Sequence, residues 1–199
     1  MAAIALPTCP LPDSMQPFLR DFGGHLTPFL GGPEQRINRI GTRFGVRYAM
    51  PPMEGEDARA FVARLMRGRF DRMLMPWPAT EFDFGDPGDP IISATAGGGS
   101  AISVGGLDLG YTIREGQFFS ILRSGRRYVH MSTGDVTPNG SGIAAVGIFP
   151  PLRTAISAGD GVELETPMIE GLVSPGDEIG WSIALELETA LAFSVVESK

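Results

Sequence analysis

The stretch TRFGVRYAMPPMEGEDARAFVARLMRG, residues 42–68, predicts a strand followed by a helix. From Thr42 to Met50, aromatic and aliphatic residues alternate with arginine, glycine and alanine, a period of two that predicts a half-buried strand ending at Pro51-Pro52. From Glu54 to Arg67, apolar residues recur at helical spacing, with acids in the first turn and arginines in the last, as the helix dipole favours. Gly68 is well suited to end this helix.

Short segments with frequent turns surround this strand and helix. We interpret the first 35 residues, which are punctuated by proline and glycine, as extended loops. The segment 81–90, rich in acids, glycine and proline, is interpreted as a domain junction. Beyond it, short strands with turn signals between them indicate a small β-barrel or sandwich. The strands expected there are 101–104, 117–122, 127–131, 143–149 and 162–165.

The end of the chain contains two more alternating strands, at 181–188 and 191–196, joined as a hairpin through 188–190. They resemble the strand at 42–50 more than the glycine-rich middle. We therefore predict a mainly β protein in which 1–85 with 178–199 forms one domain, a β-sandwich or split barrel with one flanking helix. Residues 86–177 would be inserted into it as a small β-barrel or sandwich domain.

Charge is distributed unevenly along the 199 residues, whose net charge is −7. Residues 20–72 hold 10 arginines against 6 acids, whereas 154–199 hold 9 acids against one lysine. The overall negative charge argues against a general nucleic-acid binder. The opposite signs suit copies or partners that stack face to face, and ordinary solvated faces are an equal alternative.

The sequence offers little catalytic chemistry. His25 and His130 lie far apart and belong to no metal-binding motif, and Cys9, the single cysteine, has no base beside it. We interpret His130 as a hydrogen-bonded structural residue on the surface of the strand at 127–131. The aspartates at 83, 86 and 89 are interpreted as part of a solvated linker rather than a calcium loop. We predict no catalytic, cofactor-binding or metal-binding residues, and no enzyme. Without an apolar run of about 20 residues or a basic leader, the chain is expected to be made in a cytoplasm and to have no membrane partner.

The order of several short motifs resembles a known family. They are TPFLGGPEQR at 27–36, RIGTRF at 39–44, MPPM at 50–53, ARAF at 58–61 and LMRG at 65–68, followed by GQFFSI at 116–121, YVH at 128–130 and FPPLR at 149–153. This order is similar to that of distal-tail-type and related minor tail proteins of long-tailed phages and prophages.

The resemblance implies a tail-tube-like fold and a structural virion protein made in the bacterial host. Such proteins form hexameric rings at the distal end of the tail, where they join the tail tube to the tip or baseplate. The implied partners are further copies of the chain, the tail tube protein, the tip or hub proteins and the tape measure protein. The family provides no catalytic residues. The alternative is a carbohydrate-binding accessory module at 86–177, which has no tryptophan and only Tyr111 and Tyr128 for stacking on sugars. A cell-wall hydrolase, which would need a carboxylate pair or a metal site, is a third hypothesis.

Seven residues are predicted to contribute to subunit interfaces: Arg36, Arg39, Arg43, Arg47, Trp77, Glu186 and Glu188. Arg43 and Arg47 share the polar face of their strand, and Glu186 and Glu188 share that of the strand that starts at Trp181. We expect these two faces to pair, within one subunit or between two.

Overall fold

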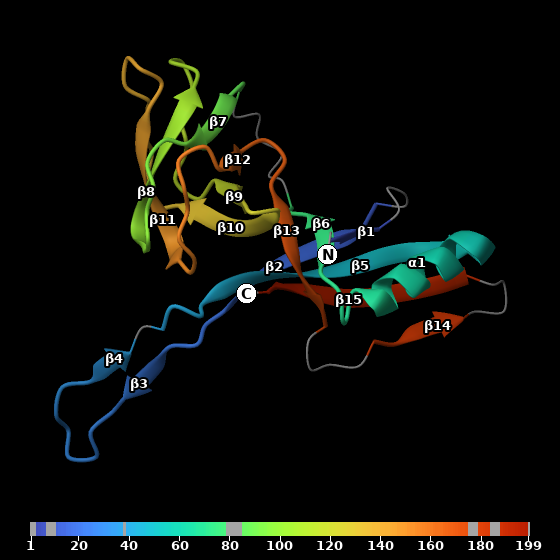
Figure 1. Cartoon of the computed structure of the whole chain (residues 1–199). Coiled ribbons are helices and arrows are strands. Elements are labelled where there is room, and N and C mark those ends of the chain that lie inside the picture. The colour runs from blue at the N-terminus through green and yellow to red at the C-terminus, as the bar shows by residue number, and fades with distance from the viewer. Residues whose placement is uncertain are drawn as a thin grey trace.

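A computed structural model describes residues 3–6, 11–37, 39–78, 85–174, 179–183 and 188–198, with the backbone alone for 181–183 and 188–190. Within these ranges the protein is mainly β with one helix, as the sequence predicts. Its strands form a seven-stranded sheet, a closed barrel and a two-stranded hairpin that projects from the body (Figure 1).

The seven-stranded sheet collects strands from both ends of the chain. Its order is β1-β6-β13-β15-β5-β2, with β14 also paired to β15. All pairs are antiparallel except β1 with β6. The strands are β1 (Ile4–Ala5), β2 (Ser14–Arg20), β5 (Arg43–Glu54), β6 (Met73–Pro76), β13 (Met168–Val173), β14 (Trp181–Ile183) and β15 (Glu188–Glu197).

The helix α1 (Gly55–Arg67) packs on one face of this sheet through Ala58, Phe61 and Leu65. The helical spacing of apolar residues predicted these contacts. Phe61 lies against Phe193 of β15, which stacks on Tyr48 of β5. These rings belong to one hydrophobic core that continues along the same face toward the barrel.

Six antiparallel strands close the barrel in the order β10-β11-β8-β7-β12-β9. They are β7 (Gly88–Ile92), β8 (Gly99–Leu107), β9 (Phe118–Arg123), β10 (Arg126–Ser132), β11 (Ala144–Leu152) and β12 (Gly161–Glu163). A separate core of aliphatic and aromatic side chains fills the barrel. Closure leaves these strands without a free edge, which favours a stable unit.

Strand β10 joins the barrel to the sheet because both of its faces are buried. Val129 and Met131 belong to the core under the sheet, whereas His130 lies against Phe119 inside the barrel. The alternation of these side chains follows the sequence, but the expectation that His130 lies on a strand surface is wrong. The sheet covers the face of β10 that carries Val129 and Met131, and the barrel interior encloses the face that carries His130.

Glu197, the last residue of β15, fixes this junction. Its carboxylate accepts hydrogen bonds from Val129 N of the barrel at 2.6 Å and from Phe44 N of β5 at 3.1 Å. Arg153 Nη2 lies 2.8 Å from Glu197 Oε2, and both side chains are buried. Burial raises the pKa of Glu197, while Arg153 and the two backbone N–H groups oppose that shift. No guanidinium nitrogen of Arg153 makes a well-aligned hydrogen bond to a described residue, so Glu197 is the partner on which its charge depends.

Three local predictions about strands are wrong. Residues 188–190 are not the connection of a hairpin, because they form the start of β15. The first 35 residues are not all loops, since they contain β2 and also β3 (Gly24–Leu26), which pairs with β4 (Gln35–Ile37). Pro51-Pro52 does not end β5, which continues to Glu54. Pro51 and Pro52 cost β5 no ladder hydrogen bond for two reasons. The pairing with β15 shifts register at this point, and the pairing with β2 extends only as far as Ala49.

The predicted division into 1–85 with 178–199 and 86–177 stays a prediction. Strand pairing adds one finding to it. β13, at Met168–Val173, lies within the predicted insertion but forms its hydrogen bonds with β6 and β15 of the seven-stranded sheet. The last strand of the barrel, β12, ends before it at Glu163.

Candidate functional site

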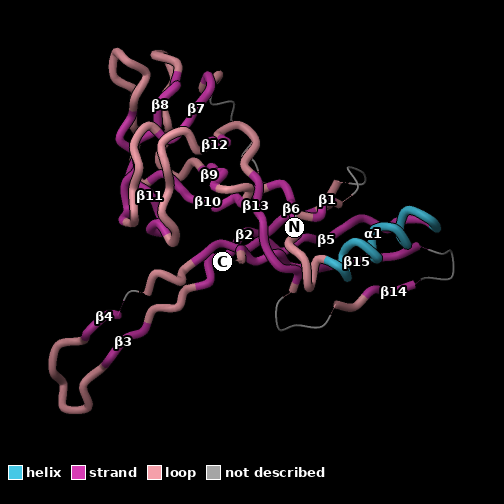
Figure 2. Tube along the Cα trace, in the orientation of Figure 1, coloured by secondary structure: helices cyan, strands magenta, loops and turns pink. Residues whose placement is uncertain are grey.

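A projecting hairpin, described for residues 21–37 and 39–41, is the feature of the chain that stands out from the body. We call it the arm. It continues the antiparallel ladder of β2 and β5, in which Arg20 pairs with Arg43, and carries β3 and β4 beyond the sheet (Figure 2). A two-stranded hairpin with no third strand or helix against it is marginally stable in water. The arm therefore has little hydrophobic core of its own.

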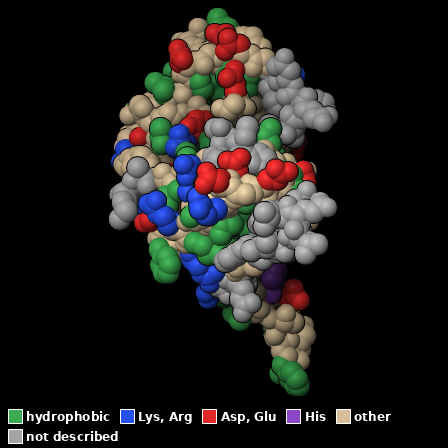
Figure 3. All heavy atoms as spheres, turned by 90° about the vertical axis from the view of Figure 1, so that its right-hand side faces the viewer, with side chains coloured by type: hydrophobic (Ala, Val, Ile, Leu, Met, Phe, Trp, Pro, Cys, Tyr) green, Lys and Arg blue, Asp and Glu red, His purple; other side chains and the backbone are tan. Residues whose placement is uncertain are grey.

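The tip of the arm carries two apolar side chains with no shelter. Phe29 is 100% exposed and Leu30 is 94% exposed. They lie between Pro28 and Gly31, where Gly31 N donates to Pro28 O and Gly31 has a φ of 76°, which glycine adopts without strain. Figure 3 shows hydrophobic side chains at the far end of the arm, clear of the body. The turn thus holds Phe29 and Leu30 out in solvent.

The base of the arm is fixed by polar contacts. Asp21 accepts hydrogen bonds from Gly23 N at 2.9 Å and from Thr42 Oγ1 at 2.7 Å. These bonds, that of Gly23 first, lower the pKa of Asp21. The guanidinium of Arg43 lies 5.0 Å from the centre of the Phe22 ring, a cation–π contact. These contacts set the direction in which the arm leaves the sheet.

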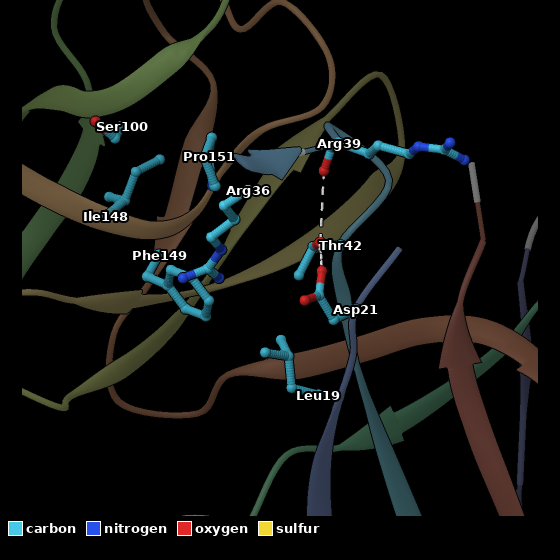
Figure 4. Close-up of a pocket in the computed structure, with 9 residues that line it drawn as sticks. All are labelled: Leu19, Asp21, Arg36, Arg39, Thr42, Ser100, Ile148, Phe149 and Pro151. Atoms are coloured by element: carbon cyan, nitrogen blue, oxygen red, sulfur yellow. Dashed lines mark hydrogen bonds between the residues drawn. The ribbon is translucent and has the colours of Figure 1, made fainter. Parts of the chain in front are cut away.

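A cleft of about 310 Å³ opens between the base of the arm and the barrel (Figure 4). Leu19, Asp21, Arg36, Arg39 and Thr42 line one side, and Ser100, Ile148, Phe149 and Pro151 line the other. Arg36 lies beside Phe149, whereas Arg39 extends away from the other lining residues. Neither guanidinium has a hydrogen-bond or ion-pair partner in the described part of the chain. Arg36 lies close enough to Asp21 to help lower the pKa of that carboxyl, so the cleft holds charges of both signs beside an apolar floor.

The structure brings some of the predicted interface residues together at this place. Arg36 and Arg39 share the cleft, and Arg43 and Arg47 lie close by on the sheet face opposite the core. Arg47 lies 4.8 Å from the Phe18 ring centre, and Phe18 covers Gly45 between the two arginines. A Cβ at residue 45 would meet that ring, so any larger residue there would push the Phe18 side chain aside.

Trp77 is placed elsewhere, in the core between sheet and barrel. Its side chain is 3% exposed and lies edge-on to Phe44 at 5.5 Å and against Phe118 at 4.8 Å. In this structure it is not accessible to a second subunit. Core packing explains the tryptophan at this position.

The predicted acidic partners of the arginines are only partly described. Glu186 lies outside the described residues, and of Glu188 only the backbone is described. Glu188 pairs with Glu54, whereas Arg47 pairs with Ser194, six residues further along β15. Six residues of strand span roughly 20 Å, so Glu188 and Arg47 do not meet within one sheet. A contact between copies stays a prediction.

The tip was missed as a candidate site by sequence analysis. The signal was the pair Phe29-Leu30 enclosed by Pro28 and Gly31-Gly32, an apolar pair inside a turn sequence. Turns are ordinarily polar, so an apolar pair inside a turn sequence marks an unusual place in the chain.

Other kinds of site find little support. Among the described residues there is no group of three or more His, Cys, Asp or Glu side chains able to hold a metal ion. No helix in those ranges is long and apolar enough to cross a membrane. Tyr111 and Tyr128, the residues predicted to stack on sugars, are both buried, with Tyr111 accepting a hydrogen bond from Gln117 Nε2.

The chain was compared with known proteins. It matches no family model and no curated protein.

Proposed function

We propose that the chain is a structural subunit that assembles with copies of itself into a ring in the tail of a long-tailed phage. The observation that carries the assembly is the arm, with Phe29 and Leu30 fully exposed at its tip. Leaving two large apolar side chains in water forgoes roughly 1.5–3 kcal/mol of burial for each of them. A partner that covers them recovers this free energy.

The shape of the molecule supports assembly through unlike surfaces. The arm extends to one side of the body, and no equivalent hairpin is described elsewhere in the chain (Figure 1). An arm that docks on a different surface of the next copy makes a heterologous contact. Such contacts close into rings or continue as filaments.

The phage-tail part of the proposal rests on the resemblance of motifs from residue 27 to residue 153. In this proposal, the seven-stranded sheet with α1 is the tail-tube-like, ring-forming part, and the barrel is an added module. The ring, a hexamer, would join the tail tube to the tip or baseplate. The separate clusters of acidic and basic side chains on one face of the molecule (Figure 3) suit stacking against such neighbours.

Oligomeric state tests the proposal. The purified full chain should form a ring with a central hole, seen by light scattering and negative-stain images. Phe29→Ser with Leu30→Ser should reduce assembly at least about 30-fold, as loss of an anchor does. Phe70→Ser is the matched control, since Phe70 is 89% exposed on the body beyond α1. A full chain that stays monomeric at high concentration, or a tip variant that assembles like the unmodified protein, would overturn the proposal.

A further inference from the structure

A groove of about 280 Å³ lies where the start of the chain crosses the helix and the sheet. Its lining comes from β1 and the segment that follows, from β5, α1 and β6, and from the start of β13. The lining residues are Ala5, Leu6, Leu11, Pro12, Met50, Phe61, Leu74, Met75, Pro76 and Met168, all of them apolar. The groove is thus an apolar surface on the part of the body that carries α1 and β1.

The arm of the same chain does not fill this groove. Phe29 at the tip is completely exposed, and the arm leaves the body on the side away from α1 and β1 (Figures 1 and 2). One chain thus carries an unburied apolar knob and an apolar recess at separate places. Within one copy, the tip and the groove are too far apart to cover each other.

We propose that Phe29 and Leu30 of one copy insert into this groove on the next copy. The inference rests on the proposed self-assembly and names the surface that receives the arm. A cavity of about 150 Å³ accommodates a benzene ring. The groove therefore has room for the phenyl ring of Phe29 with the side chain of Leu30 beside it.

The chemistry of the lining fits an aromatic knob. Met50, Met75 and Met168 contribute flexible thioether side chains that adapt to a ring and make favourable sulfur–aromatic contacts. Knob and groove are different surfaces, so each copy donates one and receives one. The contact is heterologous, as a closed ring requires.

A lipid surface is the competing occupant for the tip. Apolar side chains near arginines also insert into membranes. The groove favours a second copy, since it supplies on the same chain an apolar recess of suitable size that a lipid-binding tip does not need.

Mixing two variants, one defective in the tip and one in the groove, tests the contact between tip and groove. The first variant carries Phe29→Ser with Leu30→Ser and keeps its groove. The second carries Leu11→Arg, which puts a charge at the groove on a residue that is 72% exposed and so tolerates the change. Each should be monomeric alone. Mixed, they should form one-to-one dimers and nothing larger, because only one intact knob meets one intact groove.

The outcomes separate this inference from the proposed function. If the Leu11→Arg variant forms rings while the tip variant does not, the arm drives assembly but the groove is not its receptor, and the inference is overturned. If the unmodified chain never assembles, the proposed function fails and the inference with it. If the chain binds vesicles of anionic phospholipid through Phe29 and Leu30 but not copies of itself, the tip is a membrane anchor and the inference is wrong.

Disulfide trapping supplies a second readout. In a Cys9→Ser background, a copy with Leu30→Cys is mixed with a copy with Leu74→Cys and oxidised. The tip-to-groove dimer should exceed by at least about 10-fold the dimer formed with a Leu109→Cys copy, whose cysteine lies on the exposed barrel surface. Equal yields in an assembled sample would place the tip elsewhere and overturn the inference.

Discussion

Residues of the same type are buried in the body of this protein and exposed in its arm. In the body, Glu197 is buried and bonded to two strands and an arginine, His130 is enclosed, and Gly171 packs against backbone. In the arm, Glu34 and His25 are exposed, and Gly24 has open space around it. The difference teaches that stability resides in the body, whereas the arm leaves apolar side chains exposed to water.

The largest expected effect comes from the two glutamates. Glu197→Ala leaves Arg153 buried without its ion-pair partner and removes the acceptor of Val129 N and Phe44 N. We expect a loss of about 3–5 kcal/mol in the free energy of unfolding, measured with denaturant. Glu34→Ala, in the arm, should change it by less than about 0.5 kcal/mol. Equal effects of the two substitutions would contradict the comparison.

The two glycines give a smaller difference. A Cβ on Gly171 would collide with the backbone oxygen of Val196, in the ladder between β13 and β15. Gly171→Ala should therefore cost roughly 3 kcal/mol of stability, the upper range for overpacking. Gly24→Ala meets nothing within 4 Å and should be neutral. Thermal unfolding of both variants would show the contrast, and a fully stable Gly171→Ala protein would refute the close approach.

His130 makes the stability of the body depend on pH. Burial lowers the pKa of His130 from 6.5 to about 4, and its Nδ1 lies 2.8 Å from Pro150 O. Below pH 6.5 the unfolded chain takes up a proton that the folded chain refuses until about pH 4. The free energy of unfolding should therefore fall as the pH is lowered from 6.5 to 4, by on the order of 3 kcal/mol from His130 alone.

His130→Asn tests that contribution, because its amide can occupy the place of Nδ1. Denaturant titrations between pH 7 and pH 4 should show a shallower pH dependence in this variant than in the unmodified protein. A His130→Asn protein with an unchanged slope would mean that His130 titrates normally.

The smallest effect on stability is expected at the tip. Phe29→Ser with Leu30→Ser removes side chains that contact nothing in the body, so the free energy of unfolding should stay within about 0.5 kcal/mol. Circular dichroism on thermal unfolding measures this. A destabilised tip variant would show that the arm packs on the body in solution, and the division of labour between the two regions would not hold.

Much of the fold was predictable because its signals are local. The helix at Gly55–Arg67, the strand from Arg43 and the turn-separated strands between Gly99 and Glu163 follow from spacing that neighbouring residues determine. The strands in the first 35 residues were not predictable in this way. β2 has no clean alternation, and its hydrogen bonds come from β5, some 30 residues along the chain.

The candidate site divides along the same line. Arginines at 36, 39, 43 and 47 were singled out by their number and position, and the structure gathers them around the base of the arm. The importance of Phe29 and Leu30 depends on the arm leaving the body, which no local pattern encodes.

By itself, then, the sequence determined the mainly β class, the single amphipathic helix and the alternation along β5 and β10, because side-chain periodicity acts over a few residues. Only the tertiary structure decided that Pro51-Pro52 sits harmlessly at a shift in register, that Trp77 and His130 are buried, and that Glu197 holds barrel and sheet together. Each of these depends on a partner distant in the chain, whose position is set by how the sheet and the barrel pack. The same packing leaves Phe29 and Leu30 alone in water.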